Sequence, residues 1–313
     1  MAYRRKSSSL RARKRTGRFV KRGGPRRRYP TKKRTYRKNR AMPRKRILNI
    51  TSRKKRDTMQ TVSNTNPNTG ASQAIANNSA VVNGANQGFF VFAATGRDLT
   101  IFNGSIGAIG QEASRTSTTC YMRGLYENIR VQTSSSQPWI WRRICFKYRG
   151  FNAFNTASTS DTPLQNSNNP IFENTNGHNR LWLNQNVNGV GNTIAEQYGI
   201  LFKGQRFTDW SDPITAATDT RRVDVCYDRT RIINSGNANG VIRDYKLWHP
   251  MNKNIVYDDD ESGDVELTSN YSVKDKRGMG DYYVVDLVSG GAGATSTDLI
   301  SFNSNASLYW HEK

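Results

Sequence analysis

The densest group of side chains that could do chemistry in this sequence is acidic. Six carboxylates lie within nine residues, at Asp258, Asp259, Asp260, Glu261, Asp264 and Glu266. Clustered oxygens are what Ca²⁺ and Mg²⁺ require, and a metal-dependent nuclease also needs converging carboxylates. The spacing differs from a calcium-binding loop, in which acids alternate around a fixed glycine. Three interpretations stay open: a solvated loop, a loop that contacts a neighbouring subunit or a basic arm, and a cation site formed by the first four residues.

Other catalytic arrangements are missing from the sequence. Neither H-x-H nor H-x-x-x-H occurs among the histidines, His178, His249 and His311. C-x-x-C spacing is absent from the cysteines, Cys120, Cys145 and Cys226. No glycine-rich loop ends in Gly-Lys, as a phosphate loop does. We therefore expect no enzymatic activity, cofactor or metal. The odd number of cysteines predicts a protein without a disulfide framework, made in a reducing compartment.

Phosphate-binding chemistry is concentrated at the amino terminus. Of the 48 lysines and arginines, 26 precede the first acidic residue, Asp57. The other 22 basic residues and all 24 acidic residues lie in residues 57–313. This part therefore carries a formal charge of −2, although the whole chain carries +24. A dense block of like charge repels itself and cannot bury a core. We expect a disordered arm over residues 1–56 that binds nucleic-acid phosphates without reading their sequence.

The residues expected to bind phosphate are the lysines and arginines of this arm: Arg4, Arg5, Lys6, Arg11, Arg13, Lys14, Arg15, Arg18, Lys21, Arg22, Arg26, Arg27, Arg28, Lys32, Lys33, Arg34, Arg37, Lys38, Arg40, Arg44, Lys45, Arg46, Arg53, Lys54, Lys55 and Arg56. Tyr3, Phe19, Tyr29 and Tyr36 lie between them, either to stack on unpaired bases or as ordinary composition. Basic clusters in the arm also fit nuclear-import signals.

The sequence after the arm, residues 57–313, predicts β-strands. In the last fourteen residues the apolar side chains alternate with polar ones, at Ile300, Phe302, Ala306, Leu308 and Trp310. Similar patterns predict strands over residues 47–59, 88–94, 120–132, 139–148, 198–203, 223–228, 241–248 and 282–288, the last covered on both faces. No helical stripe of twelve residues occurs, so we expect one antiparallel sandwich or barrel over residues 57–313.

Two Asn/Ser/Thr-rich stretches, residues 61–88 and 151–195, are expected to be long loops, used for subunit contacts or an outer surface, or tolerated as insertions. Cations in or beside the strands could meet phosphate, or could pair with Asp224, Asp228 or a neighbour's carboxylates: Arg142, Arg143, Arg221, Arg222, Arg229 and Arg231. No apolar stretch is long enough for a membrane helix, so we expect no membrane insertion.

Seven segments carry a more specific signal. They read RKKRDTM (53–59), ENIRVQTSS (127–135), WRRICF (141–146), VDVCYDRTR (223–231), KLWHPMNKNIVYDDDE (246–261), GMGDYYVVDL (278–287) and SLYWHEK (307–313). This text resembles the capsid proteins of genomoviruses, the small circular single-stranded DNA viruses of the gemycircularvirus type. Residues 61–88 and 151–195 match no pattern of that family, so host and receptor contacts stay unassigned.

The resemblance implies a single eight-stranded antiparallel jelly-roll sandwich with long loops, assembled as sixty copies into a T=1 icosahedral shell around circular single-stranded DNA. It also implies a virion protein that enters the host nucleus through import receptors. Sixty arms of 26 cations hold about 1,560 positive charges, enough for the phosphates of roughly 1,500 nucleotides. The other interpretation that stays open is a cellular nucleic-acid-binding protein with a basic tail on a β domain.

Overall fold

The computed structural model describes residues 42–313, and its ordered elements begin before Asp57. Helix α1 spans Arg44–Thr51 and strand β1 spans Arg53–Thr65. The α1 segment contains neither glycine nor proline and follows Pro43, which favours a helix start there. The prediction of disorder is therefore wrong for residues 44–56, and the strand predicted from residue 47 begins at Arg53.

The first of two large sheets, called here the open sheet, has the strand order β11-β5-β15-β1-β2. Its strands are β11 (Ile242–Val256), β5 (Thr119–Thr133), β15 (Leu299–Glu312), β1 and β2 (Ser72–Ala76). Strand β3 (Ala80–Asn83) pairs with β15, and β9 (Arg180–Trp182) runs parallel to β1. All other pairings in this sheet are antiparallel.

The second, called the covered sheet, has the order β10-β6-β14-β4, with every neighbour antiparallel. Its strands are β10 (Asp224–Ile233), β6 (Trp139–Tyr148), β14 (Asp281–Gly290) and β4 (Gly88–Ala93). Two short hairpins lie apart from both sheets: β7 (Glu173–Asn174) with β8 (Gly177–His178), and β12 (Asp260–Ser262) with β13 (Val265–Leu267). The described chain is thus an all-β protein built of antiparallel sheets.

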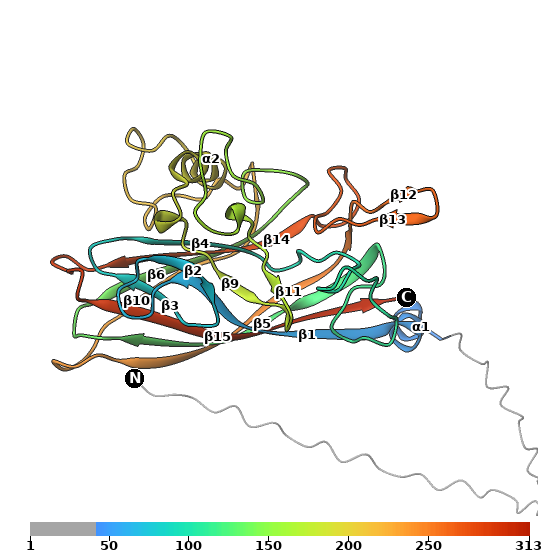
Figure 1. Ribbon diagram of the computed structural model, residues 1–313, viewed down its shortest axis with the longest axis horizontal. Helices are drawn as coiled ribbons and strands as arrows, with labels where there is room; N and C mark the ends of the chain where they lie inside the picture. The colour runs from blue at the N-terminus through green and yellow to red at the C-terminus, as the bar shows by residue number, and fades with distance from the viewer. Residues whose placement is uncertain (1–41) are drawn as a thin grey trace, which may run out of the picture. The chain divides into compact units, whose positions relative to one another are not determined.

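The main core lies between the two sheets (Figure 1). The alternating carboxy-terminal residues point into it as predicted, since Ile300, Phe302, Ala306, Leu308 and Trp310 are all buried. Burial of this apolar area, worth about 25 cal/mol per Å², is the main stabilising contribution.

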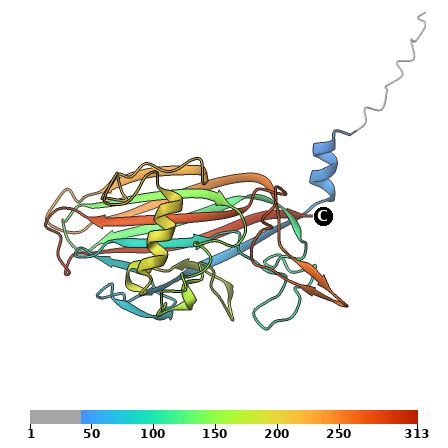
Figure 2. The same cartoon turned by 90° about the horizontal axis from the view of Figure 1, so that it is seen from above.

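A third layer lies over the far side of the covered sheet. Helix α2 (Gly191–Leu201) crosses its strands together with the segments around two short 3₁₀ helices, η1 (Asn166–Asn168) and η2 (Gln185–Val187), as Figure 2 shows. Ile194 and Tyr198 pack there against Phe89 and Val285. This layer explains why β14 is buried on both faces, as its uninterrupted apolar sequence predicted.

The other predicted strands have mixed outcomes. Those over residues 88–94, 120–132 and 139–148 are confirmed, with small shifts at their ends. Those over residues 223–228 and 241–248 are confirmed as strands, but they continue to Ile233 and Val256. The strand predicted over residues 198–203 is wrong, because Ile194, Tyr198 and Leu201 are spaced at helical intervals and belong to α2. Residues 61–88 are also no long loop, because they hold the end of β1 and strands β2 and β3. Residues 151–195 are mostly irregular, as predicted.

Candidate nucleic-acid interface

The predicted phosphate-binding residues fall into separate groups. Those from Arg4 to Arg40 lie outside the described residues. In the described part, exposed side chains belong to Arg44 and Arg46 on α1, and to Arg53, Lys54 and Arg56 on β1. Lys45 also lies on α1.

Lys55 differs from its neighbours because successive strand residues point to opposite faces. Its ammonium group lies 3.2 Å from Glu312 and donates to the Ser114 carbonyl at 2.8 Å and to Thr116 at 3.0 Å. Both charged side chains are only 2% exposed. The prediction that Lys55 binds phosphate is therefore wrong, because its charge is neutralised inside the sandwich.

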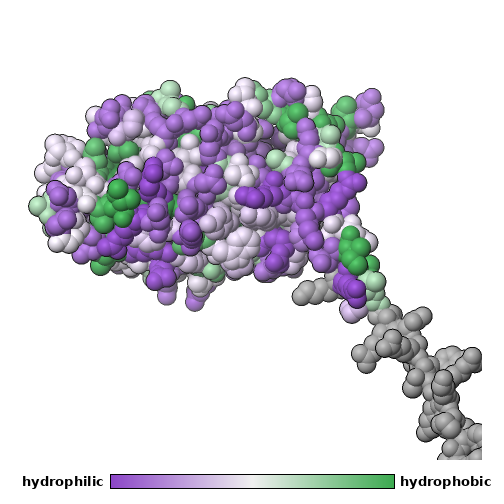
Figure 3. Space-filling model, turned by 90° about the horizontal axis from the view of Figure 1, so that it is seen from below, coloured by the Kyte–Doolittle hydropathy of each residue, from purple (hydrophilic) through white to green (hydrophobic). Residues whose placement is uncertain are grey.

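Outward-facing cations gather on the open sheet instead. Five of them are exposed and form no ion pair with another residue of the described range 42–313: Lys54, Arg56, Arg123, Arg130 and Lys246. One acidic residue, Asp244, lies at the described outer positions of β1, β5, β11 and β15. It is the register partner of Arg130 on the neighbouring strand, but the two side chains form no ion pair. Figure 3 shows this face, on which hydrophilic atoms predominate.

The cations that interrupt the strands of the covered sheet behave in the opposite way. Arg142 lies 2.7 Å from Asp228 and donates to three carbonyls, among them that of Ala216 at 2.6 Å. Arg143 is completely buried and contacts Asp286 and Glu127. These two arginines are held by the chain's own acceptors, so the phosphate role is wrong for them and the pairing alternative is correct for Arg142 with Asp228.

Four charged groups form a closed network between the sheets. Glu127 extends from the open sheet and accepts from Arg143 of the covered sheet and from Arg180 of β9, the latter at 2.7 Å. Asp286 accepts from the same two arginines at 2.7 and 3.1 Å. Burial alone raises the pKa of Glu127, but Arg143 and Arg180 lower it to about 2. The two acids and two bases balance, so the network joins the layers and offers no free charge to a ligand.

No protein-family model matches the sequence, and no curated protein matches it.

The flanking cations of β10 are more accessible. Arg221 and Arg229 are exposed, and Arg222 lies 3.4 Å from Asp219 with half of its side chain exposed. Arg231 donates to the Tyr227 hydroxyl at 2.6 Å and lies over the Trp141 ring. Arg229 and Arg231 belong to β10, the edge strand of the covered sheet, and Arg221 and Arg222 precede it, so all four lie away from the outer face of the open sheet.

The acidic cluster is split by burial. Asp259 points inward, where Arg115 contacts it at 2.6 and 2.9 Å and keeps its pKa low despite burial. Asp258, Asp260 and Glu261 are exposed beside or on the hairpin of β12 and β13. Within residues 42–313, no group of three acidic, histidine or cysteine side chains could hold a metal ion. The four residues of the candidate cation site therefore do not converge.

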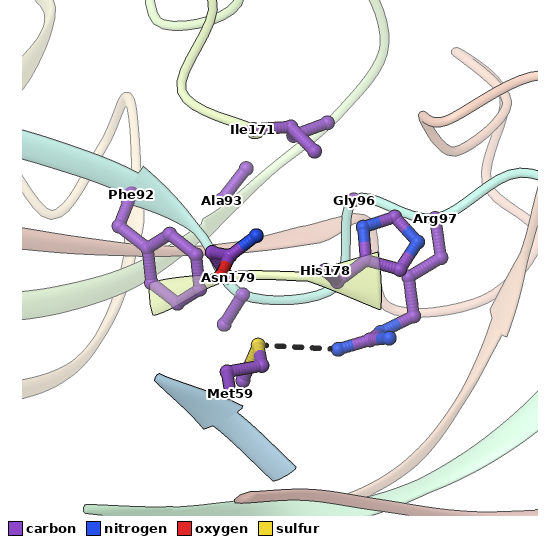
Figure 4. Close-up of a pocket in the computed structure, with 9 residues that line it drawn as sticks. Met59, Phe92, Ala93, Gly96, Arg97, Ile171, His178 and Asn179 are labelled. Carbon is purple, nitrogen blue, oxygen red and sulfur yellow. Dashed lines mark hydrogen bonds between the residues drawn. The ribbon is translucent and has the colours of Figure 1, made fainter. Parts of the chain in front are cut away.

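The remaining reactive side chains are mostly buried. Cys120 and Cys145 are buried free thiols, and Cys226 is exposed and free. His178 borders a small cavity with Met59, Arg97 and Ile171, in which Arg97 donates to the Met59 sulfur at 3.3 Å (Figure 4). Burial and the Arg97 charge hold the pKa of His178 well below its usual value. This cavity has no room for a water molecule, so it is no ligand site.

Sequence reasoning missed Arg123, Arg130 and Lys246 as candidate phosphate ligands. Arg130 alternates with buried residues of β5, and Lys246 alternates with half-buried residues of β11, so their outward direction could have been read from period two. The direction of Arg123 could not be read in this way, because a bulge between Met122 and Gly124 changes the register there. None of the helices in the described part is long and apolar enough to cross a membrane.

Proposed function

We propose that this protein is the capsid protein of a small single-stranded DNA virus of the genomovirus type. It forms an icosahedral shell and packages circular DNA through its basic amino-terminal segment. One observation carries the proposal: 26 cations precede the first acid of the chain, and the β domain that follows has a formal charge of −2. Polyanion binding and wall building thus belong to different parts of one chain.

The strand orders support a jelly roll of eight strands. Four strands of the open sheet, in the order β11-β5-β15-β1, face the four of the covered sheet, in the order β10-β6-β14-β4. Along the chain, each of these strands lies in the other sheet from the one before it, except where β10 follows β6. Connections of this kind are characteristic of double-sheet jelly rolls, which occur in viral capsids.

Packaging follows from charge neutralisation. The cations contact phosphates without reading bases and release the counterions of the DNA, which concentrates subunits on the strand. Because Lys55 is paired with Glu312, 25 of the 26 cations remain for phosphate. Sixty copies then neutralise about 1,500 phosphates, which fits a genome of one or a few genes. Near-neutral domains can close a shell through weak repeated contacts once the DNA has cancelled the repulsion between arms.

The same basic segment gives the protein a second partner. Its clusters at residues 11–15, 26–28 and 32–34 fit the sequence requirements of nuclear-import receptors, whereas the cluster at 53–56 lies in strand β1 with Lys55 buried. We place the protein in the host nucleus during assembly and in the virion afterwards. It needs no catalytic site or cofactor for these roles.

Electron microscopy of the purified full-length chain with circular single-stranded DNA tests the proposal. We expect uniform shells that protect the DNA from nuclease. A variant in which every lysine and arginine before Pro43 is replaced by glutamine should fold but lose most of its retained DNA at physiological salt, because 19 of the 25 phosphate-binding cations are removed. DNA binding without shells would instead support a cellular nucleic-acid-binding protein. DNA binding that does not weaken as salt rises contradicts the proposed phosphate contacts.

A further inference from the structure

A row of aromatic rings and a cation crosses the outer face of the open sheet. Trp248 on β11 reaches over Gly124 of β5, and its ring centre lies 5.9 Å from that of Tyr309 on β15. The absence of a side chain at Gly124 makes this reach possible, since a Cβ there would lie 2.7 Å from the indole. On β1, the Arg56 guanidinium lies over the Tyr309 ring at 5.4 Å. The row therefore spans all four long strands.

A second row lies two residues further along β1 and β15, a distance of about 7 Å, and three residues further along β5 because of the bulge there. Tyr121 on β5 and His311 on β15 have ring centres 5.9 Å apart, and Lys54 is the register partner of His311 on β1. Partial burial and the nearby Arg123 and Lys54 charges lower the pKa of His311. The second row thus repeats the first, with two rings followed by a cation, in a region of positive potential.

The face is open and its cations are unsatisfied by carboxylates. Trp248 is 47% exposed, and Tyr121, Tyr309 and His311 are half-buried. The covered sheet differs, because the layer that contains α2 buries its outer face. At the described outer positions of these four strands the acid is Asp244, toward the other end of β11, and the Glu112 backbone carbonyl accepts from the Arg56 amide.

We propose that these two rows bind single-stranded nucleic acid, with unpaired bases stacked on Trp248 and Tyr309 and phosphates held by Lys54 and Arg56. Aromatic platforms beside a basic track are how proteins hold single strands without sequence preference, at about 1–3 kcal/mol per stacked base. Lys54 and Arg56 are among the last cations of the basic residues 1–56, so the phosphate-binding side chains of that segment continue onto the sheet. This inference deepens the proposed function and rests on it for the choice of DNA as ligand.

Tryptophan fluorescence of the full-length chain provides a test, because Trp248 is the most exposed of the six tryptophans. Trp139, Trp141, Trp182 and Trp310 are buried, and Trp210 is half-buried. Stacking of a base on the indole should quench its emission. We expect an oligothymidylate of about 16 nucleotides to quench the wild-type chain, and a duplex of the same length to quench it far less because its bases are already paired.

Variants assign the signal to the face. Trp248→Phe should abolish most of the quenching, while retention of DNA in a gel persists through the basic segment. The double variant Lys54→Gln with Arg56→Gln should raise the concentration for half-maximal quenching roughly tenfold, because two phosphate contacts are lost. The matched control is Lys203→Gln with Arg206→Gln, which removes the same two kinds of charge near α2 and should leave the quenching unchanged.

Three outcomes overturn the inference. Equal quenching in the wild type and Trp248→Phe means that no base stacks on this indole. Retention of DNA without any quenching assigns all binding to the basic segment, which leaves the proposed function intact. A change in Trp248 emission with protein concentration, before DNA is added and unchanged by it, means that a second copy of the chain covers the face. Failure to retain DNA at low salt would instead contradict the proposed function.

Discussion

Arg143 and Asp286 are opposite each other on the adjacent strands β6 and β14, and hydrogen bonds of 2.7 and 2.9 Å join their side chains in the space between the sheets. The same aspartate accepts from Trp141 at 2.8 Å and from Arg180 at 3.1 Å. Its carboxylate is completely buried. The packing of the two layers therefore depends on this buried network of charged groups, which is stable only while every group in it is paired.

Removing one carboxylate from this joint should strongly destabilise the domain. Asp286→Ala leaves two buried guanidinium groups with a single acidic partner, and we expect a loss of about 3–5 kcal/mol in the free energy of unfolding. Denaturant titration measures it. The control is Asp275→Ala, which removes the partner of exposed Arg277 and should change stability far less, because solvent screens this pair. Equal effects of the two substitutions would contradict the role assigned to the network.

His249 should make stability depend on pH. Burial first, and then the Arg143 charge, lower its pKa to about 4, so the folded protein favours the neutral ring. The stabilisation is complete above the ordinary histidine pKa of about 6.5 and is lost as pH falls from there toward 4. Between about pH 7 and pH 5, the wild type should lose about 2 kcal/mol more unfolding free energy than His249→Gln.

The comparison with His249→Gln isolates this residue. Burial also raises the pKa of Asp281 to about 7, which has the opposite effect, since stability then falls as pH rises toward 7. Asp281 is present in both proteins, so its contribution cancels in the difference. If the two pH profiles are parallel, His249 is not held neutral in the folded chain.

Two adjacent lysines on β1 should behave in opposite ways. Lys55→Gln leaves Glu312 buried without its ion-pair partner, and we expect a loss of about 3 kcal/mol in unfolding free energy with little change in DNA affinity. Lys54→Gln should leave stability within about 0.5 kcal/mol and weaken DNA binding. Denaturant titration and DNA titration at one fixed salt concentration measure both effects. If Lys54→Gln lowers stability and Lys55→Gln weakens DNA binding, the assignment of Lys55 as the buried lysine is wrong.

These lysines also show how far the sequence predicts the structure. Period two predicted most of the strands and the inward face of β15, because apolar residues there alternate with polar ones. It failed for Lys55 and Arg143, since a charged residue at an inward position looks like an outward one until its partner is known. Their partners, Glu312 and Asp286, are 257 and 143 residues away in the sequence, and only the strand register brings them together.

The candidate site depends even more on register. The basic segment could be identified from composition alone, because no fold is needed to count its charges. The rows on the open sheet could not be identified from composition, since Trp248, Tyr309 and Arg56 come from three distant segments of the sequence. They meet only because β11, β5, β15 and β1 are neighbours in that order.

Gly124 should be the residue on which the geometry of the first row depends. Its φ is +155°, and a Cβ there would lie 2.5 Å from the His249 carbonyl and 2.7 Å from the Trp248 ring. Gly124→Ala must therefore move the indole or the β11 backbone, and we expect a loss of about 1–3 kcal/mol in unfolding free energy. The emission of Trp248 should shift at the same time, because its ring loses its place over β5. Gly110→Ala is the control, since a Cβ there meets nothing within 4 Å, and it should change neither quantity. If Gly124→Ala matches that control, the tryptophan does not lie across the strand, and the first row has no platform on which a base could stack.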